Sequence, residues 1–192
     1  MALSISWTIA MPALDMAEII NRIADLHRTA KALPFTAVDE IQDSPERIGF
    51  IAHGPTGSES THVWLQQTNG AWTGHGSTKT LHAGKPQHGG DENFLVAHLS
   101  IIALLDAAVR LGFLVTVTDG GGFWQHRDIR RLLMERERDA RYVTGIVEQV
   151  TEEIRQQRGM DDDDEQGEQD LDRWRQNAAL DKLLDLVVRM RQ

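Results

Sequence analysis

The chain has 192 residues, of which 29 are acidic and 20 are basic, so its formal net charge is −9. It contains no cysteine, which excludes a disulfide framework, a thiolate zinc site, an iron–sulfur cluster and a cysteine nucleophile. The acidic balance argues against nucleic-acid binding, because neutralising phosphates takes clustered Lys and Arg. We expect a soluble, cytoplasmic protein without a membrane partner, since no apolar run approaches the roughly 20 residues of a membrane span and the N-terminus lacks the basic start of a secretory signal.

A strand followed by a helix is predicted at the start of the chain. Residues 4–10 alternate between apolar and small polar side chains, which is the period of a half-buried strand. Asp15 and Glu18 fit a capping box, and apolar residues follow at helical spacing until Pro34 ends the helix. Short strands separated by loops, one of them around residues 43–45, are predicted next at three places: residues 35–41, 47–52 and 62–67.

Residues 68–91 change character, because glycines and histidines gather there. We interpret this stretch as a long loop that encloses at most a short strand at residues 78–81. Long ordered loops within compact domains are often functional. This loop is therefore one place where chemistry is expected.

The clearest helix of the chain is predicted from Asp91, as N-cap, to Gly112. It is apolar nearly all round, which is typical of a central, buried helix. A β-branched strand follows at residues 113–117, and the helix–strand–helix order leaves room for one parallel pairing. The strand ends at Asp119 and a run of three glycines, which indicates either an anion site next to a helix N-terminus or a plain turn.

A long charged helix is predicted from Arg127 to about Gln157. Within residues 140–154, apolar side chains recur at spacings of three and four, like a short coiled-coil seam. The seam packs either on its own domain, which we favour, or on a second copy of the chain. The run is shorter than the three to four heptads that make a coiled coil convincing.

We divide the chain into an α+β domain at residues 1–158, an acidic flexible linker at 159–172 and an amphipathic helix at 173–192. The linker contains four adjacent aspartates and almost no apolar residue, and it lacks the spaced ligands of an EF-hand loop. The last helix has one apolar stripe, so it is expected to dock on this chain, a second copy or a partner groove.

Two patterns in and just after this loop resemble known kinds of site. The histidines at 75, 82, 88 and 98 match no metal-binding signature, so we assign no metal. Lys79 lies in a glycine-containing run, but it lacks the preceding glycine and the following helix of a P-loop. His98 shares the spacing of apolar helix residues, and we expect it to be a core histidine with a satisfied hydrogen bond.

One stretch, residues 79–128, carries a longer pattern. Its residues are Lys79-Thr80, Ala83, Gly89-Gly90, Glu92-Asn93-Phe94-Leu95, His98-Leu99-Ser100, Ile102, Leu105-Asp106, Leu111-Gly112, Val117, Asp119, Gly121-Gly122-Phe123-Trp124 and Arg127-Asp128. On these residues the chain resembles an uncharacterised bacterial protein family. Members of that family carry Phe-Cys where this chain has Ser77 and Thr78, and an acidic residue at the place of Gly120. The family has no established activity, so the resemblance implies no reaction.

The resemblance and the residues together focus on three places: the Lys79-Thr80 loop, the start of the central helix and the turn from Asp119 to Asp128. We expect the chain to bring them to one end of the sheet, where they would line one pocket with an apolar wall and two anion contacts. The candidate ligand-binding residues are Lys79, Thr80, Glu92, Asn93, His98, Asp119, Trp124 and Arg127. No catalytic residue or cofactor can be assigned from spacing.

The predicted fold class is α+β, a mainly antiparallel sheet with helices packed on one face and a C-terminal helical extension. We predict a soluble binding or regulatory module that associates as a homodimer or recruits a protein partner through its last helix. The alternative is a small enzyme, a hydrolase or transferase, with a pocket formed by the loop at 73–93 and the turn at 119–128. No nucleophile–base pair can be assembled from spacing, which favours the binding module.

Overall fold

The computed structural model describes residues 3–11 and 15–158, with side chains up to residue 142 and at 144 and 145. The chain divides after Arg136 into two compact units. The first contains a β-sheet with its helices. Of the second, the described part is the continuation of one long helix, α4 (Ile129–Arg158). The predicted linker and C-terminal helix lie outside the described residues, as do the side chains of most of the predicted seam.

The first unit is built on one antiparallel sheet of seven strands, in the order β2-β4-β5-β6-β1-β7, with β3 also paired to β4. Every pairing among the described strands is antiparallel, so the parallel pairing allowed by the sequence is not found between them. The strands are β1 (Ser4–Met11), β2 (Ala37–Val38), β3 (Gln42–Ser44), β4 (Arg47–His53), β5 (Thr61–Thr68), β6 (Ala71–Lys79) and β7 (Leu114–Asp119).

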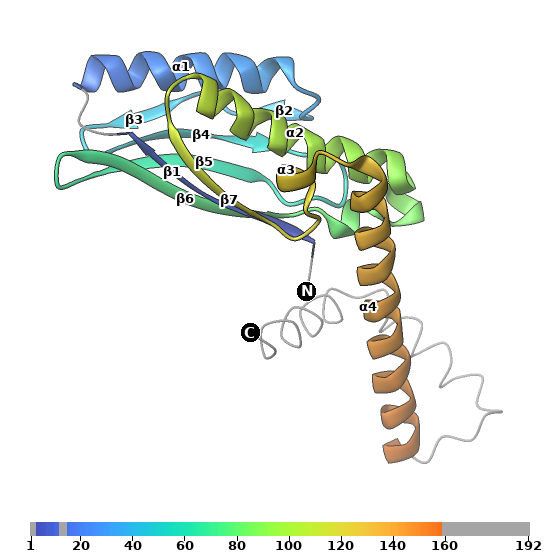
Figure 1. Ribbon diagram of the computed structural model, residues 1–192. Coiled ribbons are helices and arrows are strands. Elements are labelled where there is room, and N and C mark those ends of the chain that lie inside the picture. The colour runs from blue at the N-terminus through green and yellow to red at the C-terminus, as the bar shows by residue number, and fades with distance from the viewer. Residues whose placement is uncertain (1–2, 12–14, 159–192) are drawn as a thin grey trace. The chain divides into compact units, whose positions relative to one another are not determined.

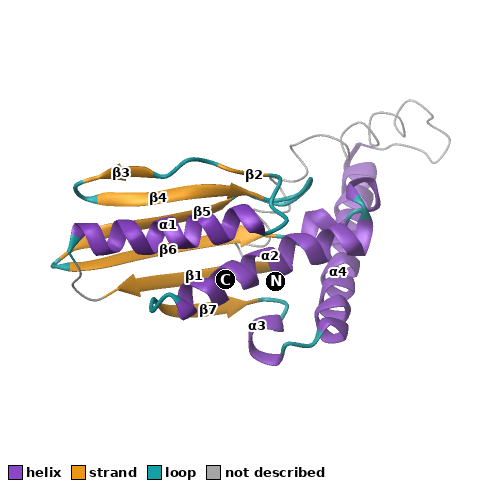
Figure 2. Cartoon of the chain, turned by 90° about the horizontal axis from the view of Figure 1, so that it is seen from above, coloured by secondary structure: helices purple, strands orange, loops and turns teal. Residues whose placement is uncertain are grey.

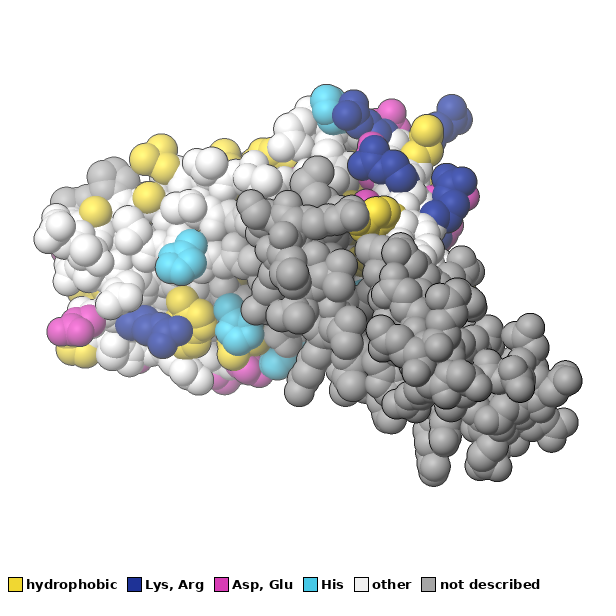
Figure 3. All heavy atoms as spheres, turned by 90° about the horizontal axis from the view of Figure 1, so that it is seen from below, with side chains coloured by type: hydrophobic (Ala, Val, Ile, Leu, Met, Phe, Trp, Pro, Cys, Tyr) yellow, Lys and Arg dark blue, Asp and Glu magenta, His cyan; other side chains and the backbone are white. Residues whose placement is uncertain are grey.

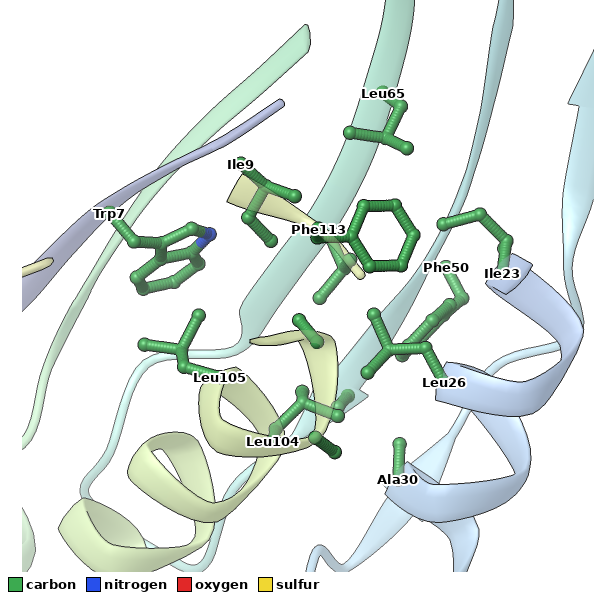
Figure 4. Packing of buried hydrophobic residues seen from close by; sticks show 14 of the residues in the cluster. Trp7, Ile9, Ile23, Leu26, Ala30, Phe50, Leu65, Leu104, Leu105 and Phe113 are labelled. Atoms are coloured by element: carbon green, nitrogen blue, oxygen red, sulfur yellow. The ribbon is translucent and has the colours of Figure 1, made fainter. Parts of the chain in front are cut away.

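Two helices, α1 (Met16–Ala32) and α2 (Gly90–Arg110), cover the same face of the sheet (Figures 1 and 2). Between them and the strands lies the main core, where Trp7 and Ile9 of β1 face Leu104 and Leu105 of α2 (Figure 4). The other face of the sheet carries no described helix. An α+β fold with an antiparallel sheet is therefore confirmed.

Helix α1 begins and ends where the sequence indicates. The Asp15 side chain accepts a hydrogen bond from the Glu18 N–H at 2.8 Å, which satisfies one of the donors left unpaired at a helix start. Leu33, the C-cap, is extended because Pro34 follows it. The buried side of α1 contributes Ile19, Ile23 and Leu26 to the main core.

The prediction of a loop at residues 68–91 is wrong in its first half, because β6 runs through it in the middle of the sheet. Glycine often indicates a loop, but in β6 it makes room for neighbouring residues. A Cβ on Gly76 would collide with the Trp7 indole, with Cε2 at 2.7 Å, and a Cβ on Gly74 would collide with the backbone of Trp64. Such glycines mark close approach within a sheet. Two 3₁₀ turns, η1 (Leu81–Gly84) and η2 (Pro86–His88), form the second half.

Three smaller predictions are also corrected. The N-cap of α2 is Gly89, in the left-handed region with φ 105°, and Asp91 pairs instead with Arg136. Gly89 caps the helix because the preceding turn η2 ends there, and this end of η2 needs a positive φ. Residues 42–44, expected to form part of a loop, form the short strand β3. The turn after β7 contains a one-turn helix, α3 (Phe123–His126).

Helix α2 is long and apolar enough, by length and composition alone, to cross a membrane, contrary to the expectation that no apolar run approaches that length. It is mostly buried in the main core, and the core helix of a soluble protein passes the same test. His98 and Ser100 interrupt its apolar sequence, and both are buried against protein. Among the described helices, this feature is compatible with a soluble protein.

The face of the sheet turned away from α1 and α2 is polar. The part of it visible in Figure 3 shows histidines and a basic side chain, with scattered hydrophobic and acidic side chains between them. Thr8, Thr73 and Thr116 are exposed there. The Arg47 guanidinium lies 4.0 Å from the centre of the Trp64 ring, a stacked pair that the sequence did not reveal.

Candidate functional site

The three places singled out in the sequence lie at one end of the sheet. In the register of the sheet, Ile5 of β1 is paired with Thr78 on one side and with Asp119 on the other, so β6 and β7 reach this end together. The first turn of α2 lies at the same end, because the Asn93 side chain donates a hydrogen bond at 2.9 Å to the Ala83 carbonyl in η1, the turn that follows β6. The expectation that the chain returns to the same end of the sheet is confirmed.

Three candidate residues are in direct contact there. Thr80 follows β6, His98 lies in the middle of α2, and Asp119 ends β7. The Thr80 hydroxyl oxygen is 3.0 Å from His98 Nδ1, and His98 Nε2 is 3.2 Å from Asp119 Oδ1. A side chain from each of three elements thus meets in one row, which we call the His98 network.

The carboxylate of Asp119 is held by backbone donors. The Gly121 N–H donates to Oδ1 and the Trp124 N–H donates to Oδ2, each at 2.8 Å. Burial of this carboxyl would by itself raise its pKa. The facing His98 ring and the N–H groups of Trp124 and Gly121 outweigh burial, so the pKa of Asp119 lies below its ordinary value.

The contact between His98 and Asp119 is close in distance but poorly aligned. At 3.2 Å it qualifies as an ion pair if the ring is charged, yet Nε2 has no partner in a well-aligned hydrogen bond. With the proton on Nε2, the ring faces the carboxylate with its N–H and accepts from Thr80 at Nδ1. The electrostatic attraction between the Nε2–H group of His98 and the Asp119 carboxylate does not require a well-aligned hydrogen-bond angle. We therefore treat the contact as electrostatic.

The His98 network is closed to solvent. The side chains of His98 and Asp119 have no exposed surface, and neither has Thr80. The His98 ring also packs on Phe94, with ring centres 5.5 Å apart, and Leu132 covers the Gly121 turn. The prediction that His98 is a core histidine is confirmed, and its hydrogen bond is supplied by Thr80.

The two expected anion contacts lie at the surface, and each has a carboxylate beside it. Lys79 Nζ is 3.7 Å from Glu59 Oε1. Arg127 holds Asp106 through two hydrogen bonds of 2.7 and 2.8 Å, and its guanidinium lies 4.7 Å from the centre of the Trp124 ring. An anion at either cation would therefore compete with a protein carboxylate.

Two of the remaining candidates, Asn93 and Glu92, lie at the start of α2. Asn93 donates from Nδ2 to the carbonyls of Thr56 and Ala83, so it fastens a loop and a turn to the start of α2. Glu92 is exposed on the first helical turn. The N-terminal end of α4, where an anion could bind, is occupied by the carboxylate of Asp128, which accepts a hydrogen bond from the Arg130 N–H at 2.9 Å.

The histidines singled out in the loop do not converge. His75 is exposed on β6, His82 and His88 lie in the two 3₁₀ turns, and His98 is in the core. Across residues 3–11 and 15–158, no group of three or more His, Asp or Glu side chains is arranged to hold a metal ion.

No family model, curated protein or solved structure matches this chain. The resemblance to an uncharacterised bacterial family stays a prediction.

Proposed function

We propose that this protein is a soluble, non-catalytic binding or regulatory module that associates with protein chains, copies of itself included. The observation that carries the proposal is the burial of the His98 network. A general base must come within about 3 Å of the proton that it takes from a substrate. No substrate atom comes that close to a hydroxyl, an imidazole and a carboxylate without exposed surface.

The same network suits a structural role in a binding module. It joins the end of β6, the middle of α2 and the end of β7 through Thr80, His98 and Asp119. Binding is favoured when the binding surface is already ordered, because less conformational entropy is lost on association. The network therefore supports a rigid surface at this end of the sheet.

A small hydrolase or transferase is the second candidate. What favours it is the order of groups, hydroxyl then imidazole then carboxylate, which matches the order of nucleophile, base and orienting acid in acyl transfer. Its pocket would lie between residues 73–93, which span the end of β6 and the two 3₁₀ turns, and the turn at 119–128. In this account Thr80 has to become exposed before any reaction.

Native mass spectrometry combined with an esterase assay separates the two. The binding module predicts a dimer without added small-molecule mass, and ester hydrolysis that is equal in wild type and Thr80→Val. The variant Thr73→Val, which removes an exposed hydroxyl, serves as the matched control. A monomer that retains a small molecule, or turnover that Thr80→Val alone abolishes, would contradict the binding module and support the enzyme.

The anion pocket of the enzyme candidate has a test of its own. If Lys79 and Arg127 bind an anionic ligand, the double variant Lys79→Ala, Arg127→Ala loses inorganic phosphate binding in isothermal titration. The binding module predicts no phosphate binding in either protein, since Glu59 and Asp106 already accompany the two cations. Saturable phosphate binding that depends on both cations would contradict this expectation.

A further inference from the structure

The two edges of the sheet differ sharply. One edge consists of β2, with two residues, and β3, with three exposed residues that include Asp43. Very short strands and charged side chains are the devices by which natural sheets keep an edge from pairing with another strand. This edge is protected.

The opposite edge is β7, which borders the sheet in Figure 2 and pairs only with β1 among the described strands. Between Leu114 and Thr118 it has no charged residue, proline or glycine, and it pairs without a bulge. Leu114 is 66% exposed. None of the usual protective devices is present on this strand.

The hydrogen-bond pattern shows which backbone groups of β7 point outward. The Gly120 N–H donates to the Ser4 carbonyl at 3.0 Å, so by alternation Thr118, Thr116 and Leu114 also face β1. The N–H and C=O groups of Val115 and Val117 then point away from the sheet. Within the described part of the chain, no backbone hydrogen bond uses them.

We propose that β7 pairs antiparallel with β7 of a second copy, about a two-fold axis through Thr116. This inference rests on the proposed binding function and names its partner. In this register Val115 of one copy exchanges two hydrogen bonds with Val117 of the other, and the symmetric pair does the same. Thr116 then faces Thr116 of the second copy in a non-hydrogen-bonded pair, where side chains come closest. Threonine pairs across strands are favourable.

Two features of the sheet favour a second copy over an unrelated strand as the partner of β7. The uncharged alternation of Val and Thr around Thr116 is nearly the same when read from either side of the axis, as a two-fold contact requires. The protected edge at β2 and β3 also ends the assembly, because a dimer joined through β7 presents only protected edges. The product is a closed dimer rather than a fibre.

Charge substitution at the two-fold axis tests the pairing. We use the full chain, low ionic strength and sedimentation velocity over a range of concentrations, with circular dichroism to show that each variant is folded. Thr116→Lys places two like charges opposite each other, so the dimer dissociation constant should rise by about 100-fold or more. Thr116→Glu should behave alike, and an equimolar mixture of the two should recover the dimer. Thr73→Lys, exposed on the same face but within β6, should dimerise as wild type does.

Each other outcome has one meaning. A dimer that Thr116→Lys leaves unchanged overturns the β7 pairing while the binding module stands, with its contact elsewhere. A dimer that Thr73→Lys disrupts equally places the contact on the face of the sheet and also overturns edge pairing. A wild-type protein that stays monomeric up to millimolar concentration overturns the pairing. If that monomer also turns over a substrate through Thr80, the proposed function fails with it.

Discussion

Among the residues of the His98 network, Asp119 is expected to contribute most to the stability of the end of β7. Replacing it with Asn keeps the shape but removes the charge that faces His98, and it turns an amide N–H toward the backbone donor of Trp124 or Gly121. Leaving buried donors unpaired is costly, and we expect a loss of roughly 3 kcal/mol in the free energy of unfolding. Urea denaturation followed by circular dichroism measures it.

The matched control is another carboxylate of the same unit. Asp106 is paired with Arg127 at the surface, so Asp106→Asn should cost less than about 1 kcal/mol. Equal losses in the two variants would show that the His98 network contributes no more than a surface ion pair.

The lowered pKa of Asp119 makes stability depend on acid. The unfolded chain has an ordinary Asp pKa of about 3.9, and the folded pKa lies below it. The carboxylate therefore contributes stability above about pH 4, and this contribution is lost as the pH falls through the folded pKa. Urea denaturation curves measured from pH 6 down to pH 2.5 give the free energy of unfolding of each protein. The difference in this free energy between wild type and Asp119→Asn should become smaller as the pH falls. A difference that stays constant would contradict the assigned pKa direction.

Part of the site could be predicted at this scale. The periodicity of α2 placed His98 in the core, and the strand end placed Asp119 at a turn. The carboxylate partners of Lys79 and Arg127 could not be predicted, because Glu59 and Asp106 lie twenty and twenty-one residues away along the chain. Only the strand register and the course of the chain after β7 bring them together.

At the level of single strands, β6 fits in the centre of the sheet because Gly74 and Gly76 have no side chain that would collide with its neighbours. Gly76→Ala places a methyl group against the Trp7 indole, a buried ring that has little room to move. We expect a loss of about 2 kcal/mol from overpacking, measured as a shift of the urea midpoint. Thr73→Ala on the same strand points to solvent and should stay within about 0.5 kcal/mol of wild type. Equal stability of all three proteins would contradict close packing at Gly76.

The strands and helices were predictable wherever one period dominated. β1 shows the two-residue alternation, and α1 and α2 show helical spacing. β6 was missed because Gly74 and Gly76 carry no local sign of being packed against Trp64 and Trp7, which come from other strands. The sequence predicts β7 as a strand. Its position at the edge of the sheet depends on which strand it pairs with, and a single sequence does not show that this partner is β1.

At the scale of the molecule, the sheet unit should fold without the C-terminal part. Its two buried clusters are made of residues from Leu3 to Leu132. A chain ending at residue 158 should melt within a few degrees of the full chain in differential scanning calorimetry, and should still dimerise. A clear fall in melting temperature would show that residues beyond 158 complete the core.

In the proposed dimer, β7 pairs with its copy through the backbone groups of Val115 and Val117. The most direct measurement is amide hydrogen exchange of residues 114–118, resolved by NMR at low and high protein concentration. We expect the amides of Val115 and Val117 to exchange rapidly in dilute solution and to become protected as the dimer forms. Thr116, already bonded to β1, should be protected in both. Rapid exchange of Val115 and Val117 in a sample shown to be dimeric would rule out pairing through β7.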